Sequence, residues 1–349
     1  MTNPPKPLTG ADDLIAAGLA TPRQREEIAR IARRYAIAIT PPMAALIDTA
    51  DPDDPIARQF VPSAAELETA DNERADPIGD DAHSPVPGLV HRYPDRVLLK
   101  LANTCPVYCR FCFRREMVGP GRAAALSSGE IDAAMAYIAG RPAIWEVIVT
   151  GGDPLHLAPR RLAGVMSALE PITHVRVVRF HTRVPVVAPE RIDERLVASL
   201  TGTTKTVYVG VHVNHPRELT AAARSALARL SAAGAVLVSQ TVLLKGVNDD
   251  IATLEALMRA LVEARVKPYY LHHGDLAPGT RHLRVPLAEG QALVAALRGR
   301  LSGLAQPTYV VDIPGGHGKV PAARAWVQIH QDGSADLSDP GGNVHPYRD

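Results

Sequence analysis

The sequence is poor in cysteine. Only three of its 349 residues are cysteines, namely Cys105, Cys109 and Cys112. All three lie within eight positions, and no other cysteine is present to pair with them, so a disulfide framework is excluded. Free, clustered cysteines are typical of a reducing compartment. We therefore expect a cytoplasmic protein that uses these thiols for chemistry and not for packing.

Excess charge and long apolar segments are missing as well. Lys and Arg number 38 and Asp and Glu 37, for a net charge of +1, which predicts neither nucleic acid nor an acidic membrane surface as a partner. No apolar run reaches the roughly 18 residues of a membrane span. The start, MTNPPKPLTGADD, has no apolar core flanked by basic residues, so we expect no signal peptide. The length suffices for one large barrel or two domains.

The cysteines have the spacing C-x3-C-x2-C within LLKLANTCPVYCRFCFRR, which spans residues 98–115. This spacing lets a loop wrap three thiolates around one face of an iron–sulfur cluster. In a four-iron cluster, three cysteines leave one iron open to a small molecule, so the pattern suggests chemistry at the cluster. The alternatives are a zinc site, which would need a fourth ligand, and a ferredoxin site, which would supply a fourth cysteine.

Apolar runs typical of strands alternate with helical segments after residue 90. This alternation predicts parallel β–α units with right-handed crossovers, arranged as a doubly wound sheet or as an open partial barrel. In barrels the chemistry lies at the carboxyl ends of the strands, and the cysteine loop directly follows the first predicted strand. The predicted strands are 97–102, 147–150, 175–181, 207–213, 236–244 and 268–271, and the helices are 128–139, 160–169, 193–200, 218–233 and 249–264.

The first 90 residues are predicted to form a helical region followed by a linker. Asp12 and Asp13 can cap a short helix that ends at Gly18, and Thr21-Pro22 can open a second helix, which Pro41-Pro42 should stop. Residues 51–90 are acidic, rich in proline and without periodicity, as expected for a linker. We therefore divide the chain into 1–90, a barrel over 91–275 and a C-terminal segment over 276–349.

Polar and glycine residues follow several predicted strands. Gly151-Gly152-Asp153 comes after the second strand, where glycines let the backbone approach a ligand, although a plain turn with Asp153 as a cap fits equally. His181-Thr182-Arg183 follows the third strand, and Gln240 lies in the fifth. Each of these polar side chains can instead be solvated or hydrogen-bonded within the fold, with no contact to a ligand. We select Arg183 and Gln240 as contacts in the cofactor or cluster neighbourhood.

A second motif, DIPGGHGK, spans residues 312–319 after the apolar run 309–311. It is not a phosphate-binding G-x4-G-K-[ST] loop, because its spacing is too short and Val320 follows the lysine. One interpretation is a surface turn that carries a solvated lysine without a function in catalysis. A lysine presented on a glycine-rich turn can instead form a Schiff base with a carbonyl cofactor such as pyridoxal phosphate (PLP).

These motifs together resemble a known family. The aromatic Phe111 before the last cysteine resembles the cluster motif of radical S-adenosylmethionine (radical SAM) enzymes. HRYPDRVLL, the cysteine loop, GGDPL, HTRVPV, SQTVLLKGVND, PYYLHHGDL and PTYVVDIPGGHGK occur in the order found in lysine 2,3-aminomutase, over about residues 76–321. The resemblance implies a partial (βα)6 TIM-type barrel, a [4Fe-4S] cluster held by the three cysteines, and SAM held at Gly151, Gly152, Asp153, Arg183 and Gln240.

The resemblance also implies the roles of other residues. Lys319 matches the PLP-binding lysine, with His317 in place of a glycine of the family motif, while Arg92 and Arg96 match arginines near the PLP phosphate. Arg114 matches the arginine that pairs with the substrate carboxylate, a job that suits a guanidinium.

Asp275 and Asp312 match the two aspartates that hold the substrate ε-ammonium. Two carboxylates select a long cationic side chain and repel an acidic one, which argues against the glutamate 2,3-aminomutases. A relative that makes β-lysine for elongation factor P modification lacks counterparts of these aspartates.

The implied activity is that of an isomerase that interconverts L-lysine and β-lysine (3,6-diaminohexanoate), with SAM regenerated in each cycle. One alternative is related chemistry in a modification pathway or on another amino acid. Another is an inactive iron–sulfur relative, which the replacement of a motif glycine by His317 leaves open. An electron donor such as flavodoxin or ferredoxin and a homo-oligomer are implied as well. The family's extra zinc-binding cysteines are missing, so we expect no zinc, and we predict that the C-terminal DLSDPGGNVHPYRD is a loop.

Overall fold

The computed structural model describes residues 6–119, 121 and 123–349. Its centre is a nine-stranded sheet in which the strands follow one another in sequence order. Seven strands, β2 to β8, are parallel, whereas β1 and β9 pair antiparallel at the two edges. The strands are β1 (Leu89–Tyr93), β2 (Arg96–Ala102), β3 (Glu146–Gly151), β4 (Val177–Thr182), β5 (Thr206–His212), β6 (Val236–Val242), β7 (Lys267–His272), β8 (Thr308–Asp312) and β9 (Lys319–Pro321).

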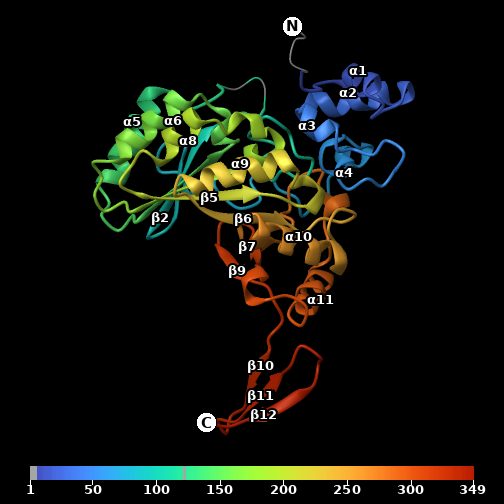
Figure 1. Cartoon of the computed structure of the whole chain (residues 1–349), viewed down its shortest axis with the longest axis vertical. Helices are drawn as coiled ribbons and strands as arrows, with labels where there is room; N and C mark the ends of the chain where they lie inside the picture. The colour runs from blue at the N-terminus through green and yellow to red at the C-terminus, as the bar shows by residue number, and fades with distance from the viewer. Residues whose placement is uncertain (1–5, 120, 122) are drawn as a thin grey trace.

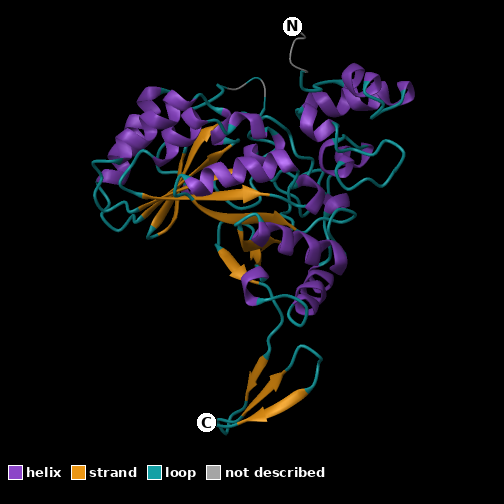
Figure 2. Cartoon of the chain, in the orientation of Figure 1, coloured by secondary structure: helices purple, strands orange, loops and turns teal. Residues whose placement is uncertain are grey.

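The crossover helices cover the outer face of this sheet, which curls into an open half-barrel (Figure 2). Each of the strands β2 to β7 is followed by a helix before the next strand begins, and the two edge strands do not pair with each other, so the barrel stays open. The prediction of a partial TIM-type barrel is thereby confirmed. The helices are α5 (Ser128–Ala139), α6 (Pro159–Leu169), α8 (Glu194–Thr201), α9 (Ala221–Ala232), α10 (Ile251–Glu263) and α11 (Leu287–Leu297), with the short α7 (Val184–Val187) after β4.

Capping residues set the boundaries of these helices. Ser127 caps α5, which spans the predicted range. The predicted helix 218–233 begins later, because the Thr220 hydroxyl accepts a hydrogen bond from the N–H of Ala223 and starts α9 there. The residues just before it, Pro216–Glu218, form a separate 3-10 turn.

The N-terminal region differs from its prediction in two places. Gly10 precedes α1 (Ala11–Ala16), so Asp12 and Asp13 lie in the first turn and do not cap it. Thr21 does open the second helical segment through a capping box with Gln24, but α2 (Arg25–Arg34) ends well before Pro41. The prolines open the next helix, α3 (Pro41–Ala44), because a proline is tolerated in the first turn of a helix, where its missing N–H has no partner to lose.

The predicted linker packs against the barrel. It forms α4 (Ala57–Phe60), η2 (Ala64–Leu67) and η3 (Asp81–His83), and Gln59, Glu66 and Asp80 are buried. The composition of residues 51–90 resembled a linker because the segment buries polar side chains, which pair with arginines of the barrel. Figure 1 shows the N-terminal helices beside the barrel, in blue.

The C-terminal end corrects a further prediction. DLSDPGGNVHPYRD is not a loop but contains β11 (Ala335–Ser338) and β12 (Val344–Tyr347), which form a sheet with β10 (Val327–Ile329). Asp339 closes the turn between β11 and β12 by accepting a hydrogen bond from the N–H of Asn343 at 2.9 Å. We call residues 323–349 the C-terminal arm, which projects away from the barrel (Figure 1). Among the described residues, no helix has the length and apolarity needed to cross a membrane.

Candidate active site

The three cysteines lie in the loop directly after β2, at the carboxyl end of the barrel, and none forms a disulfide. Cys105, Cys109 and Cys112 line one small cavity together with Tyr108 and Arg115. Burial, with a contribution from the neighbouring Cys109, raises the pKa of the Cys112 thiol to about 11. Three thiols that line one small cavity ionise together only when a cation binds them. The donor set therefore fits an iron–sulfur cluster.

The glycine turn after β3 packs directly on the start of this cysteine loop. A Cβ atom on Gly152 would lie 2.4 Å from the carbonyl oxygen of Thr104, the residue before Cys105, and Gly151 has a φ of 111°. Only glycines allow this approach. Asp153 caps the following turn, as one of the two interpretations predicted, and its buried carboxylate accepts hydrogen bonds from the Leu155 N–H and the Thr182 hydroxyl.

Arg183 reaches the cysteine loop, whereas Gln240 lies in β6, next to His212 of β5. Arg183 Nη1 donates a hydrogen bond to Cys109 Sγ at 2.8 Å. Gln240 Oε1 instead lies 2.6 Å from Nε2 of His272, which connects it to the surroundings of Lys319. The two residues selected from the sequence thus serve two parts of one site.

Lys319 begins β9 and points back toward the barrel. Its ammonium pairs with the Asp312 carboxylate and lies 3.2 Å from Nδ1 of His272. Burial and the nearby lysine lower the pKa of His272 to about 4, so the imidazole is neutral. The Tyr93 hydroxyl accepts a hydrogen bond from the Lys319 backbone N–H at 2.8 Å. His317 is exposed to solvent.

The two predicted aspartates differ in charge. Burial raises the pKa of Asp312, but His272 and the charge of Lys319 outweigh that effect and hold it below its ordinary value. Burial raises the pKa of Asp275 to about 7, and the negative charge of Asp312 contributes to the shift. Lys319 therefore balances the Asp312 carboxylate, whereas Asp275 forms no salt bridge with any residue that the structure describes.

The predicted arginines are also held by protein groups. Arg114 Nη2 donates to Asp80 at 2.9 Å, and Arg92 Nη2 donates to the other oxygen of the same carboxylate at 3.1 Å. Arg96 does not contact Asp80 but lies with its guanidinium 3.8 Å from the centre of the Tyr93 ring and donates to Asp95. Asp80 is buried and joins two predicted site residues, yet the sequence analysis did not select it, since no local motif marks it.

Two histidines near the carboxyl ends of β4 and β5 were given no role from the sequence. His181 and His212 are partly buried, and desolvation lowers the pKa of each ring well below its ordinary value. Within the described part of the chain, Nε2 of each ring has no hydrogen-bond partner. The ring of Phe111 stacks on His212, which ties the cysteine loop to β5.

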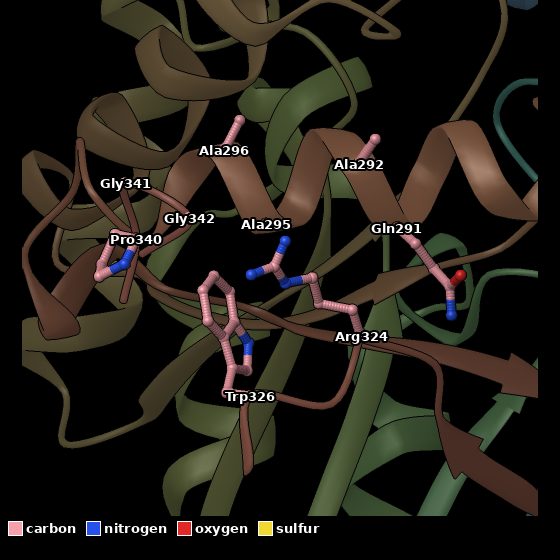
Figure 3. Close-up of a pocket in the computed structure, with 9 residues that line it drawn as sticks. All are labelled: Gln291, Ala292, Ala295, Ala296, Arg324, Trp326, Pro340, Gly341 and Gly342. Atoms are coloured by element: carbon pink, nitrogen blue, oxygen red, sulfur yellow. The ribbon is translucent and has the colours of Figure 1, made fainter. Parts of the chain in front are cut away.

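A separate cavity of about 490 Å³ lies away from these residues, between α11 and the C-terminal arm. Figure 3 shows Arg324 and Trp326 of the arm beside the helix, near Ala295. The guanidinium of Arg324 lies 4.2 Å from the centre of the Trp326 ring. This cavity holds no group that could take part in chemistry at the cysteines.

Comparisons with known proteins agree with this geometry. The family model described as the Radical SAM superfamily matches residues 99–258. An L-lysine 2,3-aminomutase of Acetoanaerobium sticklandii is 42% identical over 88% of this chain and 74% of that protein, and one of Clostridium subterminale is 41% identical over 88% and 73%. A glutamate 2,3-aminomutase of Clostridioides difficile is 36% identical over 90% of this chain and 74% of that protein.

Proposed function

The chain belongs to the lysine 2,3-aminomutase family of radical SAM enzymes, and from that premise we propose that it interconverts L-lysine and β-lysine with PLP bound at Lys319. Membership makes it an isomerase that uses a [4Fe-4S] cluster and SAM. The observation that supports lysine as the substrate is the pair Asp275 and Asp312 beside Lys319, with Arg114 within electrostatic reach of Asp275.

These residues divide the recognition of a diamino acid among them. Arg114 is suited to hold the α-carboxylate, because a guanidinium pairs with a carboxylate in two-point geometry. Asp275 and Asp312 are suited to hold the distal ammonium. When bound, the cluster and SAM supply a radical for hydrogen abstraction, and PLP supplies the carbonyl that takes up the migrating nitrogen. The barrel orients these groups and excludes water.

The contacts of Lys319 suggest how the site changes when it fills. Lys319 uses Asp312 as its counterion. When its amine is committed to a carbonyl, Asp312 becomes available to a second cation. A substrate ammonium would supply that cation and would favour the ionised form of Asp275. An acidic side chain would instead meet two carboxylates, which disfavours glutamate.

We assign the contacts to SAM to the backbone of Gly151 and Gly152, to Asp153 and to the side chains of Arg183 and Gln240. The support is that the glycine turn packs on the cysteine loop and that Arg183 donates to Cys109 Sγ, while Gln240 contacts His272 beside Lys319. Arg92 and Arg96 remain our assignment for the PLP phosphate, with Asp80 fixing the first of them. We also propose a small electron-transfer protein such as flavodoxin or ferredoxin as the reductant, and the cytoplasm as the compartment.

A homo-oligomer is proposed from the C-terminal arm. Strand pairing places Val327, Ile329, Leu337, Ala335 and Tyr347 on one face of its sheet. Ile329 is 76% exposed, and Val327 and Tyr347 are each 52% exposed. A small sheet needs its apolar face covered to be stable. The arm projects beyond its own barrel, so a second copy related by two-fold symmetry would provide that cover.

An assay for β-lysine tests the proposed reaction. The protein is reconstituted with iron and sulfide without oxygen, and PLP, SAM, a reductant and L-lysine are added. We expect β-lysine by mass spectrometry, loss of the product in Lys319→Ala and Asp312→Ala, and no loss in the matched control Lys245→Ala, an exposed lysine. SAM cleavage with lysine unchanged would overturn the substrate assignment. Product formation by Lys319→Ala would overturn the role of that lysine.

A further inference from the structure

We propose that Gln59, from the N-terminal region, is a positioning residue that aims Arg183 at the Cys109 thiolate and thereby sets the reduction potential of the cluster. Gln59 lies in α4, far in sequence from both residues, and its side chain is completely buried. The inference concerns the cluster alone and does not depend on the identity of the substrate.

The Gln59 amide is fully engaged. Its oxygen accepts hydrogen bonds from Arg183 Nη2 at 2.6 Å and from Asn214 Nδ2 at 3.0 Å. Its nitrogen donates to the Pro55 carbonyl at 3.1 Å and to Glu218 Oε1 at 3.1 Å. Because the amide oxygen faces two donors and the amide nitrogen faces two acceptors, only one orientation of the amide fits. The Gln59 side chain is therefore fixed, and it fixes the position of the Arg183 guanidinium.

Arg183 depends on this anchor for its direction. One nitrogen, Nη2, donates to both Gln59 and the Glu218 carboxylate, the latter at 2.7 Å, and this leaves Nη1 aimed at Cys109 Sγ. Without the amide, Glu218 alone attracts the guanidinium. The Gln59 nitrogen also donates to Glu218 and so weakens the competition of that carboxylate for Arg183. Both effects of Gln59 favour the bond to sulfur.

A hydrogen bond to a ligating sulfur stabilises the reduced cluster, because reduction increases the negative charge on the sulfur. Losing the bond should lower the potential. The backbone of Gln59 makes its own contact, since its carbonyl accepts from the N–H of Arg110, between two of the cysteines, at 2.8 Å. A side-chain substitution keeps that contact, so the effect of the amide can be measured with the loop in place.

The test is a redox titration of the reconstituted protein followed by EPR, without substrate. For Gln59→Leu we expect an approximately tenfold less favourable cluster reduction, which is about 59 mV for one electron. The matched control Gln331→Leu, at an exposed glutamine, should leave the potential unchanged. If Gln59→Leu yields too little loaded protein, Gln59→Asn, whose shorter amide cannot reach all four partners, carries the same expectation.

A double-mutant cycle tests whether Gln59 acts through Arg183. Arg183→Met should lower the potential at least as much as Gln59→Leu, and the double variant should show no further decrease. An unchanged potential in Gln59→Leu with full iron content, or shifts that add in the double variant, would overturn the proposal. Neither readout requires turnover, so failure of the lysine assignment would be distinguished from failure of this inference.

Discussion

Single residues at this site are tuned by their neighbours more than by their own chemistry. Asp312 and Asp275 are both aspartates, yet Lys319 and His272 hold the pKa of the first low, whereas burial and the charge of the first raise the pKa of the second to about 7. Asp275 is thus ready to ionise when a cation arrives. Binding of a substrate ammonium below about pH 7 should release a proton from it.

The raised pKa of Asp275 predicts a pH dependence of stability. The native carboxyl binds its proton more tightly than the unfolded one, whose pKa is about 3.9. The free energy of unfolding should therefore fall as the pH rises from about 4 to about 7, and stay level above that. Asp275→Asn should remove this slope and be roughly 1–2 kcal/mol more stable than the parent protein at pH 8.

Urea unfolding of the cofactor-free protein at pH 5 and pH 8 measures this effect. Asp71→Asn, at an exposed position, is the matched control and should keep the slope of the parent protein. If Asp275→Asn and Asp71→Asn show the same dependence on pH, Asp275 is ionised in the folded state and the proposed proton release is wrong.

Residues that carry a local motif could be selected from the sequence as site candidates, and those that act by spatial proximity could not. The three cysteines, Lys319 and the glycine turn each have neighbours in sequence that reveal them. Asp80 and Gln59 have none. Asp80 pairs with Arg92 and Arg114, and Gln59 accepts a hydrogen bond from Arg183. These residues are distant in sequence and come into contact only in the folded chain.

At the scale of elements, the turn after β3 and the cysteine loop form one packed unit. Gly152→Ala would place a Cβ 2.4 Å from the Thr104 carbonyl oxygen and 2.8 Å from its nitrogen. Backbone atoms cannot move aside cheaply, so we expect a loss of about 1–3 kcal/mol in unfolding free energy and reduced iron uptake. Unfolding curves and iron analysis after reconstitution measure both.

Gly164→Ala is the control for this substitution. Gly164 lies in α6, and a Cβ there meets no atom within 4 Å. Alanine should stabilise that helix by about 0.5–1 kcal/mol, with full iron uptake. Normal iron content in Gly152→Ala would show that the turn does not hold the cysteine loop in place.

The 3-10 helix η2 holds the other side of the cysteine loop. Its Glu66 is buried and pairs with Arg110 at 2.5 Å and with Arg115. Glu66→Gln would leave two buried guanidinium groups without their counterion, which costs roughly 3–5 kcal/mol. We expect a correspondingly lower urea midpoint, whereas Glu68→Gln, at an exposed position of the same segment, should match the parent protein. Equal midpoints would mean that the network contributes no net stability.

At the scale of the whole molecule, the barrel was predictable and its surroundings were not. Alternating strand and helix periods located six strands and five crossover helices within a few residues, but they left a doubly wound sheet open, and the resemblance to radical SAM enzymes selected the barrel. The N-terminal segment resembled a linker because its buried groups are polar, and burial of polar groups depends on partners that periodicity does not reveal. The C-terminal strands were missed because their turn, DPGGN, was counted as part of a loop.

The arm gives the last prediction, which concerns assembly. Its apolar face carries Ile329, 76% exposed, while Gln328, Asp336 and Ser338 lie on the opposite face. If a second copy covers the apolar face, Ile329→Lys buries a charge there and should weaken self-association at least tenfold. Light scattering after size exclusion measures the mass, with Gln331→Lys as the control on the same arm. Because the cysteines and Lys319 lie in the barrel, the dissociated protein should still take up iron. An unchanged mass in Ile329→Lys would mean that the arm does not join two chains through this face.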